Sequence, residues 1–185
     1  GMLGQYDIGW FEEALKPDAI DDFCELRRAS PVPIAGGEVL TRRQAFLPWL
    51  TRGAFDIVQP DVTKVGGISE QRRIAWLAHD FGVKYIGHGW NTALGVAADL
   101  QLASAFPDTD LVEFIGGSPY VDGILRQPFT LDAEGCLFIP ELPGWRERSL
   151  PAGREGRVTY RHYDPYSQAL AKIERGHAKD VADVT

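Results

Sequence analysis

The chain of 185 residues has two cysteines, one methionine, no long apolar run and fewer basic than acidic side chains. Cys24 and Cys136 lack metal-ligand spacing, which favours reduced thiols and a cytoplasmic location. No apolar run approaches the roughly 18 residues that span a bilayer, so we expect no membrane partner. The balance of 19 basic to 26 acidic side chains (net charge −7) argues against nucleic acid, whose phosphates bind clustered Lys and Arg.

What is present indicates a folded domain. Hydrophobic residues make up 44% of the chain and charged residues 24%, which is enough apolar surface to build a core. These proportions exclude a disordered chain, a collagen-like chain and a disulfide-framed miniprotein. Gly1 before Met2 is typical of a cleaved tag, and we set it aside.

One unit of a short apolar run followed by a helical stretch repeats through the first 116 residues. The runs are 8–11, 32–35, 55–58, 83–86 and 111–115. An ionisable residue stands near the end of each run: Glu12, Glu38, Asp61, His88 and Glu113. Consecutive members of this set are 26, 23, 27 and 25 positions apart. The pattern predicts parallel strand–helix repeats whose sheet is buried on both faces.

Four helices are predicted between these strands. Thr41 and Gln44 form a capping-box pattern that begins the second helix, Gly53 ends it, and Pro48 predicts a kink inside it. The other helices are predicted from Pro17 through the positions after Ile20, from Ser69 to Gly82, and from Asn91 or Thr92 to about Ala105.

Ionisable residues at the ends of all the strands favour a (β/α) barrel, because the carboxyl ends of barrel strands converge on one face. A doubly wound open sheet is the alternative, but it places a Gly-rich phosphate turn after its first strand. No G-x-G-x-x-G motif occurs here. We therefore predict an α/β fold, a partial barrel over residues 2–116.

Residues 117–185 have a different character and are predicted to pack on the barrel. Runs 129–131 and 137–139 flank a turn at 132–135 and predict a hairpin. The Pro- and Gly-rich stretch 140–153 predicts irregular surface chain. Beyond it, we expect a strand at 157–160 and a polar helix from Tyr166.

The five ionisable residues allow two readings each. Glu12 and Glu38 could share a divalent cation such as Mg²⁺, or could cap helices and pair with arginines. Asp61 could orient His88 as a general base, or His88 could be a buried histidine bonded to a backbone carbonyl. Glu113 could bind a substrate anion when protonated, or could close the barrel.

Lys64, three positions after Asp61, is a further candidate. It could be a second charged catalytic group or simply the salt-bridge partner of Asp61.

Four segments carry a resemblance to a known family: Trp10–Glu13, Pro33–Glu38, Asp56–Ile68 and Gly87–Asn91. In this order and spacing they resemble the enolase superfamily, in its mandelate racemase/muconate lactonizing enzyme group and the mandelate racemase-like branch. A later segment, Ile139–Gly144, is similar to the closing segment of that family.

The resemblance implies a role for each residue of the set. Glu12 and Glu38 would be metal ligands on the fourth and fifth barrel strands, whereas Glu13, on the opposite strand face, would not. Asp61 and His88 would be the dyad, with His88 as the base, and Glu113 would hydrogen-bond the substrate. The implied chemistry is Mg²⁺-assisted abstraction of a proton α to the carboxylate of a sugar acid, as in a dehydratase (lyase) or racemase (isomerase).

The resemblance also implies missing parts. The family carries an N-terminal capping domain and three earlier strands, with a Lys motif on the second and a third carboxylate ligand on the third. We therefore expect strands 4–8 without the capping domain, and a chain that is inactive by itself. The alternative is a non-catalytic truncated half-barrel. Its open sheet edges predict a homo-oligomer.

Overall fold

The computed structural model describes residues 2–106, 109–125, 127–137, 151–155 and 158–161. The chain divides into two compact units, residues 1–139 and 140–185. In the second unit, β5 (Pro151–Glu155) pairs antiparallel with β6 (Val158–Arg161). This confirms the strand expected near 157–160. The expectation of irregular chain up to residue 153 is wrong for residues 151–153, which belong to β5. They form a strand because β6 supplies backbone hydrogen-bond partners, which the Pro and Gly content of the sequence does not reveal. The helix expected from Tyr166 lies outside the described residues.

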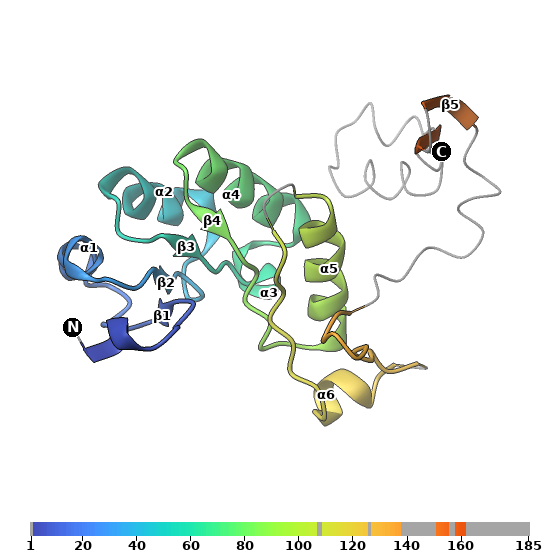
Figure 1. The fold of residues 1–185 in the computed structure, drawn as a ribbon, viewed down its shortest axis with the longest axis horizontal. Coiled ribbons are helices and arrows are strands. Elements are labelled where there is room, and N and C mark those ends of the chain that lie inside the picture. The colour runs from blue at the N-terminus through green and yellow to red at the C-terminus, as the bar shows by residue number, and fades with distance from the viewer. Residues whose placement is uncertain (1, 107–108, 126, 138–150, 156–157, 162–185) are drawn as a thin grey trace. The chain divides into compact units, whose positions relative to one another are not determined.

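Four parallel strands form the sheet of the first unit, in the order β1-β2-β3-β4 (Figure 1). They are β1 (Phe11–Glu12), β2 (Ile34–Gly36), β3 (Ile57–Val58) and β4 (Lys84–Tyr85). Glu12 pairs in register with Ala35, and Ala35 with Ile57. Each strand lies in or overlaps a predicted run, so the first four strand–helix repeats are confirmed.

The fifth predicted strand, 111–115, is wrong: this described segment has no strand structure. The two residues just before it contact β4 through their side chains instead of a backbone ladder. The Thr109 hydroxyl donates to the Tyr85 carbonyl oxygen (3.0 Å), and Lys84 Nζ lies 2.7 Å from Asp110 Oδ1. Leu111 is 45% exposed, so this run lacks the two covered faces that a buried parallel strand has.

The helices alternate with the strands. A short 3₁₀ turn (Met2–Gln5) comes first, and the α-helices are α1 (Ile20–Ala29), α2 (Arg42–Arg52), α3 (Val62–Val65), α4 (Ile68–Asp80), α5 (Ala93–Ser104) and α6 (Pro119–Asp122). Gly53 ends α2 in the left-handed conformation, as predicted.

Three details differ from the cap predictions. Pro17 lies before α1 rather than in its first turn, and Gly67, not Ser69, precedes α4. Thr41 is the N-cap of α2 but makes no side-chain capping bond, so the capping box is not formed. Helix α2 continues through Pro48 because tertiary packing of Phe46, Trp49 and Leu50 holds it.

Alternate residues of the strands pack on opposite sides of the sheet. On one side lie α1, α2 and α4 (Figure 1), and Ile34 and Val58 join their apolar residues in the main core. On the other side Ala35, Ile57 and Ile86 form a smaller cluster against Trp10. Both faces are therefore apolar, and polar side chains gather where the strands end.

The hairpin expected after residue 128 is reduced to one antiparallel bridge, Leu131 to Leu137. Asp132 Oδ1 accepts the backbone N–H groups of Glu134 and Cys136 and so closes the turn. Residues 138 and 139 of the predicted hairpin lie outside the described residues.

Candidate active site

Four of the five ionisable residues of the repeat lie at or after the carboxyl ends of successive strands. Glu12 ends β1, Glu38 follows β2, Asp61 follows β3 as the N-cap of α3, and His88 follows β4. Glu113 lies in the irregular segment next to β4. In the structure His88 contacts the carboxylates of three of the others: Glu38, Asp61 and Glu113.

His88 and Asp61 form a buried pair. His88 Nδ1 lies 2.9 Å from Asp61 Oδ2, and the two residues are 5% and 0% exposed. This contact makes Nδ1 the protonated nitrogen of neutral His88 and leaves Nε2 as the basic atom. The ring is thus oriented in the way a general base requires.

Asp61 is held as a carboxylate by several donors. Its Oδ1 accepts from the Thr63 N–H (2.8 Å), the Thr63 hydroxyl (2.6 Å) and Asn91 Nδ2 (3.3 Å). Burial raises the pKa of Asp61, but the hydrogen bonds from His88 and Thr63 and the charge of Lys64 outweigh burial and hold it well below 3.8. Asp61 therefore remains charged and can stabilise an imidazolium.

His88 Nε2 faces two carboxylates. It lies 3.1 Å from Glu38 Oε2 and 3.9 Å from Glu113 Oε2. Burial lowers the pKa of His88, but the bond to Asp61 and the charges of Glu38 and Glu113 raise it above 6.5 overall. The site therefore favours a His88 that has taken up a proton at Nε2.

Lys64 lies between two acids of the site. Its Nζ is 3.5 Å from Asp61 Oδ2 and 3.9 Å from Glu38 Oε1, and its side chain is 39% exposed. Lys64 is thus the ion-pair partner of Asp61 that one interpretation expected. In the same position the Lys64 side chain is also partly exposed to solvent.

Glu12, which ends β1, and Glu13, which follows it, point to different sides. Glu12 Oε2 accepts from Gln59 Nε2 (2.6 Å) and Trp10 Nε1 (2.9 Å), on the side of the smaller cluster. Glu13 Oε1 accepts the Gly37 N–H (2.7 Å) on the helix side. Burial and then the charges of Glu38 and Glu12 raise the pKa of Glu13, although the Gly37 N–H lowers it.

The oxygen ligands that Glu12 and Glu38 offer are of the type that Mg²⁺ prefers. Glu12 and Glu38 are carboxylates after adjacent strands, and Mg²⁺ uses one or two protein carboxylates together with water and substrate oxygens. Within the part of the chain that is described, three or more acidic, histidine or cysteine side chains do not converge as a ready-made metal cluster. A cation would therefore take further ligands from outside this set.

Glu113 is positioned by a tight backbone approach. Its Oε2 accepts the Gly89 N–H (2.7 Å), and a Cβ atom at Gly89 would overlap the backbone carbonyl group of Glu113. We expect Gly89→Ala to lower the free energy of unfolding by about 1–3 kcal/mol, because a backbone segment cannot move as cheaply as a flexible side chain.

Urea unfolding of Gly89→Ala measures this effect. Gly9→Ala is the matched control, because no atom lies within 4 Å of a Cβ at that position. Equal stabilities for the two variants would contradict the close packing of residues 89 and 113.

Sequence reasoning missed Gln59, Thr63 and Asn91 as partners of the acids. Gln59 holds Glu12, and Thr63 and Asn91 hold Asp61. The sequence does place them near the site, since each lies within three residues of Asp61 or His88 along the chain. Uncharged side chains carry no distinguishing pattern, however, until the fold shows what they face.

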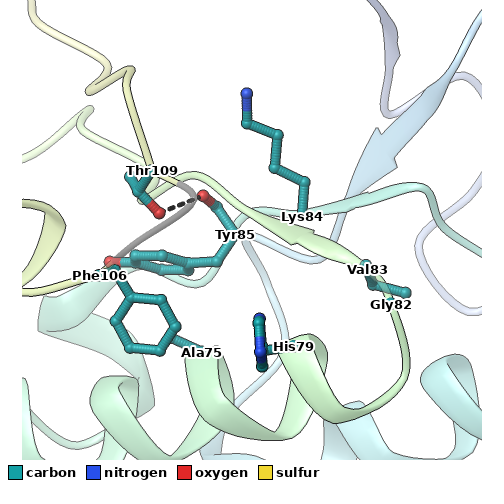
Figure 2. A pocket seen from close by; sticks show the side chains of 8 residues that line it. All are labelled: Ala75, His79, Gly82, Val83, Lys84, Tyr85, Phe106 and Thr109. Carbon is teal, nitrogen blue, oxygen red and sulfur yellow. Dashed lines mark hydrogen bonds between the residues drawn. The ribbon is translucent and has the colours of Figure 1, made fainter.

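A cavity of about 410 Å³ lies away from this site (Figure 2). Val83 and Lys84 at the beginning of β4 line it, together with Ala75, His79, Gly82, Tyr85, Phe106 and Thr109. The cavity is therefore at the opposite end of β4 from His88. None of the five repeat residues lines it.

Comparisons with known proteins agree with this arrangement. Residues 1–145 match the enolase C-terminal domain-like family model. The chain is 34% identical over 169 residues to the D-galactarolactone cycloisomerase of Agrobacterium fabrum, covering 86% of this chain and 44% of that protein. It is 31% identical over 142 residues to the D-xylonate dehydratase of Haloferax volcanii, covering 77% and 34%.

A solved mandelate racemase/muconate lactonizing enzyme from a Sulfitobacter species is similar in structure. Its TM-score is 0.69 at 32% identity, over 74% of this chain and 34% of that one. The chain thus spans less than half the length of these relatives. In the described residues, no helix is both long and apolar enough to cross a membrane.

The structure and the comparisons agree on the kind of fold. The sheet is parallel with acids at the strand ends, and the family match covers residues 1–145. The chain belongs to the enolase C-terminal domain-like family and corresponds to the C-terminal, barrel portion of mandelate racemase/muconate lactonizing enzymes of the enolase superfamily.

Proposed function

We propose that this chain supplies the general base and two metal ligands of an enzyme that removes the proton α to the carboxylate of a sugar acid. The observation that carries the proposal is the orientation of His88. Asp61 binds its Nδ1, and its Nε2 faces Glu38 and Glu113. The similarity to a sugar-acid dehydratase and a lactone cycloisomerase supports the substrate class.

Each residue has one task in this proposal. His88 Nε2 takes the α-proton, and Asp61 stabilises the resulting imidazolium. Glu113, 3.9 Å from that nitrogen, donates a hydrogen bond in its protonated form to the substrate carboxylate as charge develops there. Lys64, which contacts Asp61 and Glu38, moderates the negative charge of the site. After abstraction, the carbon is either reprotonated on its other face (racemisation) or loses a β-hydroxyl group (dehydration).

Glu12 and Glu38 would hold Mg²⁺. The bound cation would neutralise the charge that develops on the substrate carboxylate. Gln59 and Trp10 fix one oxygen of Glu12, so this carboxylate is already oriented. Glu38 contacts His88 and Lys64, which shows that its environment accommodates positive charge.

We further propose that the 185-residue chain does not turn over by itself, because two carboxylates do not complete the ligand set. The test is a chimera in which residues 2–145 replace the matching segment of the A. fabrum cycloisomerase. Exchange of the α-proton in D₂O, followed by NMR over a panel of sugar acids with Mg²⁺, is expected for the chimera. No exchange is expected for its His88→Asn variant or for the isolated chain.

A folded chimera without exchange, or exchange that survives His88→Asn, would contradict the proposed function. Circular dichroism and a cooperative thermal transition establish that the chimera is folded. Exchange by the isolated chain would contradict only the claim that it is inactive.

The alternative of a non-catalytic homo-oligomer has one observation in its favour. Both residues of the edge strand β1 are exposed, and Phe11, Ile8 and Tyr6 leave 38%, 36% and 62% of their surfaces open. An uncovered apolar edge favours pairing with another chain. Multi-angle light scattering is expected to show an oligomer, and a stable monomer at high concentration would count against this alternative.

A further inference from the structure

A buried polar group lies behind the dyad and takes no part in the chemistry proposed above. Gln71 of α4, Tyr85 of β4 and Asp99 of α5 are 0%, 3% and 1% exposed. Gln71 Nε2 donates to the Tyr85 hydroxyl (2.8 Å) and to Asp99 Oδ1 (2.7 Å). Both amide hydrogens of Gln71 are thereby used, and Asp99 Oδ1 has its donor.

Asn91 connects this group to the dyad. Its Nδ2 lies 3.3 Å from Asp61 Oδ1 and 3.4 Å from the His88 carbonyl oxygen. Both of these atoms are acceptors, so the amide nitrogen must be on the dyad side, and the reversed amide would place oxygen against oxygen. The Asn91 oxygen therefore faces away from the dyad and lies against Gly95, which is one helical turn before Asp99 in α5.

Three oxygens in this region are buried without a donor: Gln71 Oε1, Asn91 Oδ1 and Asp99 Oδ2. A buried acceptor that lacks a donor destabilises the fold, because it has lost its hydrogen bonds to water. A carboxylate and an amide oxygen cannot satisfy each other, but a carboxylic acid donates one hydrogen bond to an amide oxygen. A single proton on Asp99 Oδ2 would therefore provide a partner for two of the three oxygens, Asp99 Oδ2 and Asn91 Oδ1.

We propose that Asp99 is held as a neutral carboxylic acid that donates to Asn91 Oδ1 and, through Asn91, positions Asp61 and His88. Asp99 is then a positioning residue for the base, and this role in catalysis rests on the function proposed above. The hydrogen-bond chain runs from Tyr85 and Gln71 through Asp99 and Asn91 to the Asp61 carboxylate.

Electrostatics agrees with the geometry. Burial raises the pKa of Asp99 to about 7, and the charge of Asp61 contributes in the same direction. The hydrogen bond from Gln71 and the charge of His88 lower it, but burial dominates. Because the pKa is raised, the acid form predominates below pH 7, and pH 6 is the condition at which to test it.

Three variants separate a neutral acid from a carboxylate. Asn at position 99 can accept from Gln71 with its oxygen and donate to Asn91 with its nitrogen, so Asp99→Asn reproduces the protonated acid. Asp99→Leu keeps the approximate volume but removes both bonds. Asn91→Ala removes the link to the dyad and leaves Asp99 in place, which keeps the test independent of whether Asp99→Leu folds.

Two spectroscopic readouts on the isolated chain at pH 6 test the proposal. Infrared difference spectra between the wild-type chain and Asp99→Asn, with ¹³C-labelled aspartate, are expected to show a protonated-carboxyl band that the variant lacks. The downfield NMR resonance of the His88 Nδ1 proton reports the dyad. We expect Asp99→Asn to retain this resonance, and Asp99→Leu and Asn91→Ala to broaden or lose it.

No protonated-carboxyl band in the wild-type chain would overturn the proposal, as would loss of the His88 resonance in Asp99→Asn. An unchanged resonance in Asn91→Ala would overturn the positioning role. Neither readout requires turnover. A failed exchange assay in the chimera would therefore reject the proposed function without bearing on the state of Asp99.

Discussion

Asp61→Asn is expected to lower the free energy of unfolding by about 3 kcal/mol at pH 7. Asp61 is fully buried and accepts from His88 on one oxygen and from Thr63 and Asn91 on the other. An asparagine has one acceptor oxygen, so its amino group must face a donor on one side. Leaving a buried donor unpaired and removing a paired charge costs about 2–4 kcal/mol together.

The pH dependence of this difference has a definite sign. The pKa of Asp61 is lower in the folded chain than its ordinary 3.8, so its stabilisation is fully present above that value. The stabilisation is lost as the pH falls through the lower folded-state value. Below pH 5, where His88 is protonated in both chains, the gap between the wild-type chain and Asp61→Asn should therefore shrink as the pH falls.

Urea unfolding at several pH values measures this gap, with the exposed Asp18→Asn as a control that should change stability by less than about 0.5 kcal/mol. A gap that grows as the pH falls below 5 would show that Asp61 is not a stabilised carboxylate.

Phe55→Ala is expected to lower the free energy of unfolding by about 3–5 kcal/mol. Phe55 is 2% exposed and stacks on Trp49 with ring centroids 4.9 Å apart, and it meets Phe23 edge-on at 5.2 Å. Removing the ring leaves a cavity between α1, α2 and the sheet. Since whole domains are stable by only about 5–15 kcal/mol, this loss is a large part of the total.

The same ring supports the turn that carries Glu38. A Cβ at Gly36 would lie 2.9 Å from the Phe55 ring, and Gly37 is similarly close to Phe46 and has a φ of +108°. Phe55→Ala should therefore also loosen the turn before Glu38. Thermal and urea unfolding measure the loss, and Phe81→Ala, at a phenylalanine that is 44% exposed, is the control. Similar losses in both variants would contradict the core assigned here.

The strand–helix order could be predicted because it rests on local signals. Apolar runs, Gly53 after α2 and Thr92 before α5 mark element boundaries without knowledge of the fold. The grouping of Asp61 and His88 could also be predicted, since parallel strands bring their carboxyl ends to one edge. The catalytic and metal-binding roles of these residues remain proposals.

Other features depend on contacts that the sequence does not encode locally. The run 111–115 is apolar enough for a strand but forms none, and the residues just before it, Thr109 and Asp110, contact β4 through their side chains. Gln59 and Asn91 acquire their roles only from what they face. Asp99 did carry a signal: it is a single acidic residue in α5, whose first turns are apolar, and only the fold shows what surrounds it.

Calorimetric titration of the metal-free chain with Mg²⁺ tests the central claim most directly, which is that Glu12 and Glu38 form part of a cation site. Because the two carboxylates make an incomplete ligand set, we predict one weak site, with a Kd on the order of 1 mM. Glu38→Gln should abolish it, whereas Glu25→Gln, at an exposed glutamate of α1, should leave it unchanged. Binding that is unaffected by Glu38→Gln, or no binding to the wild-type chain, would contradict the account.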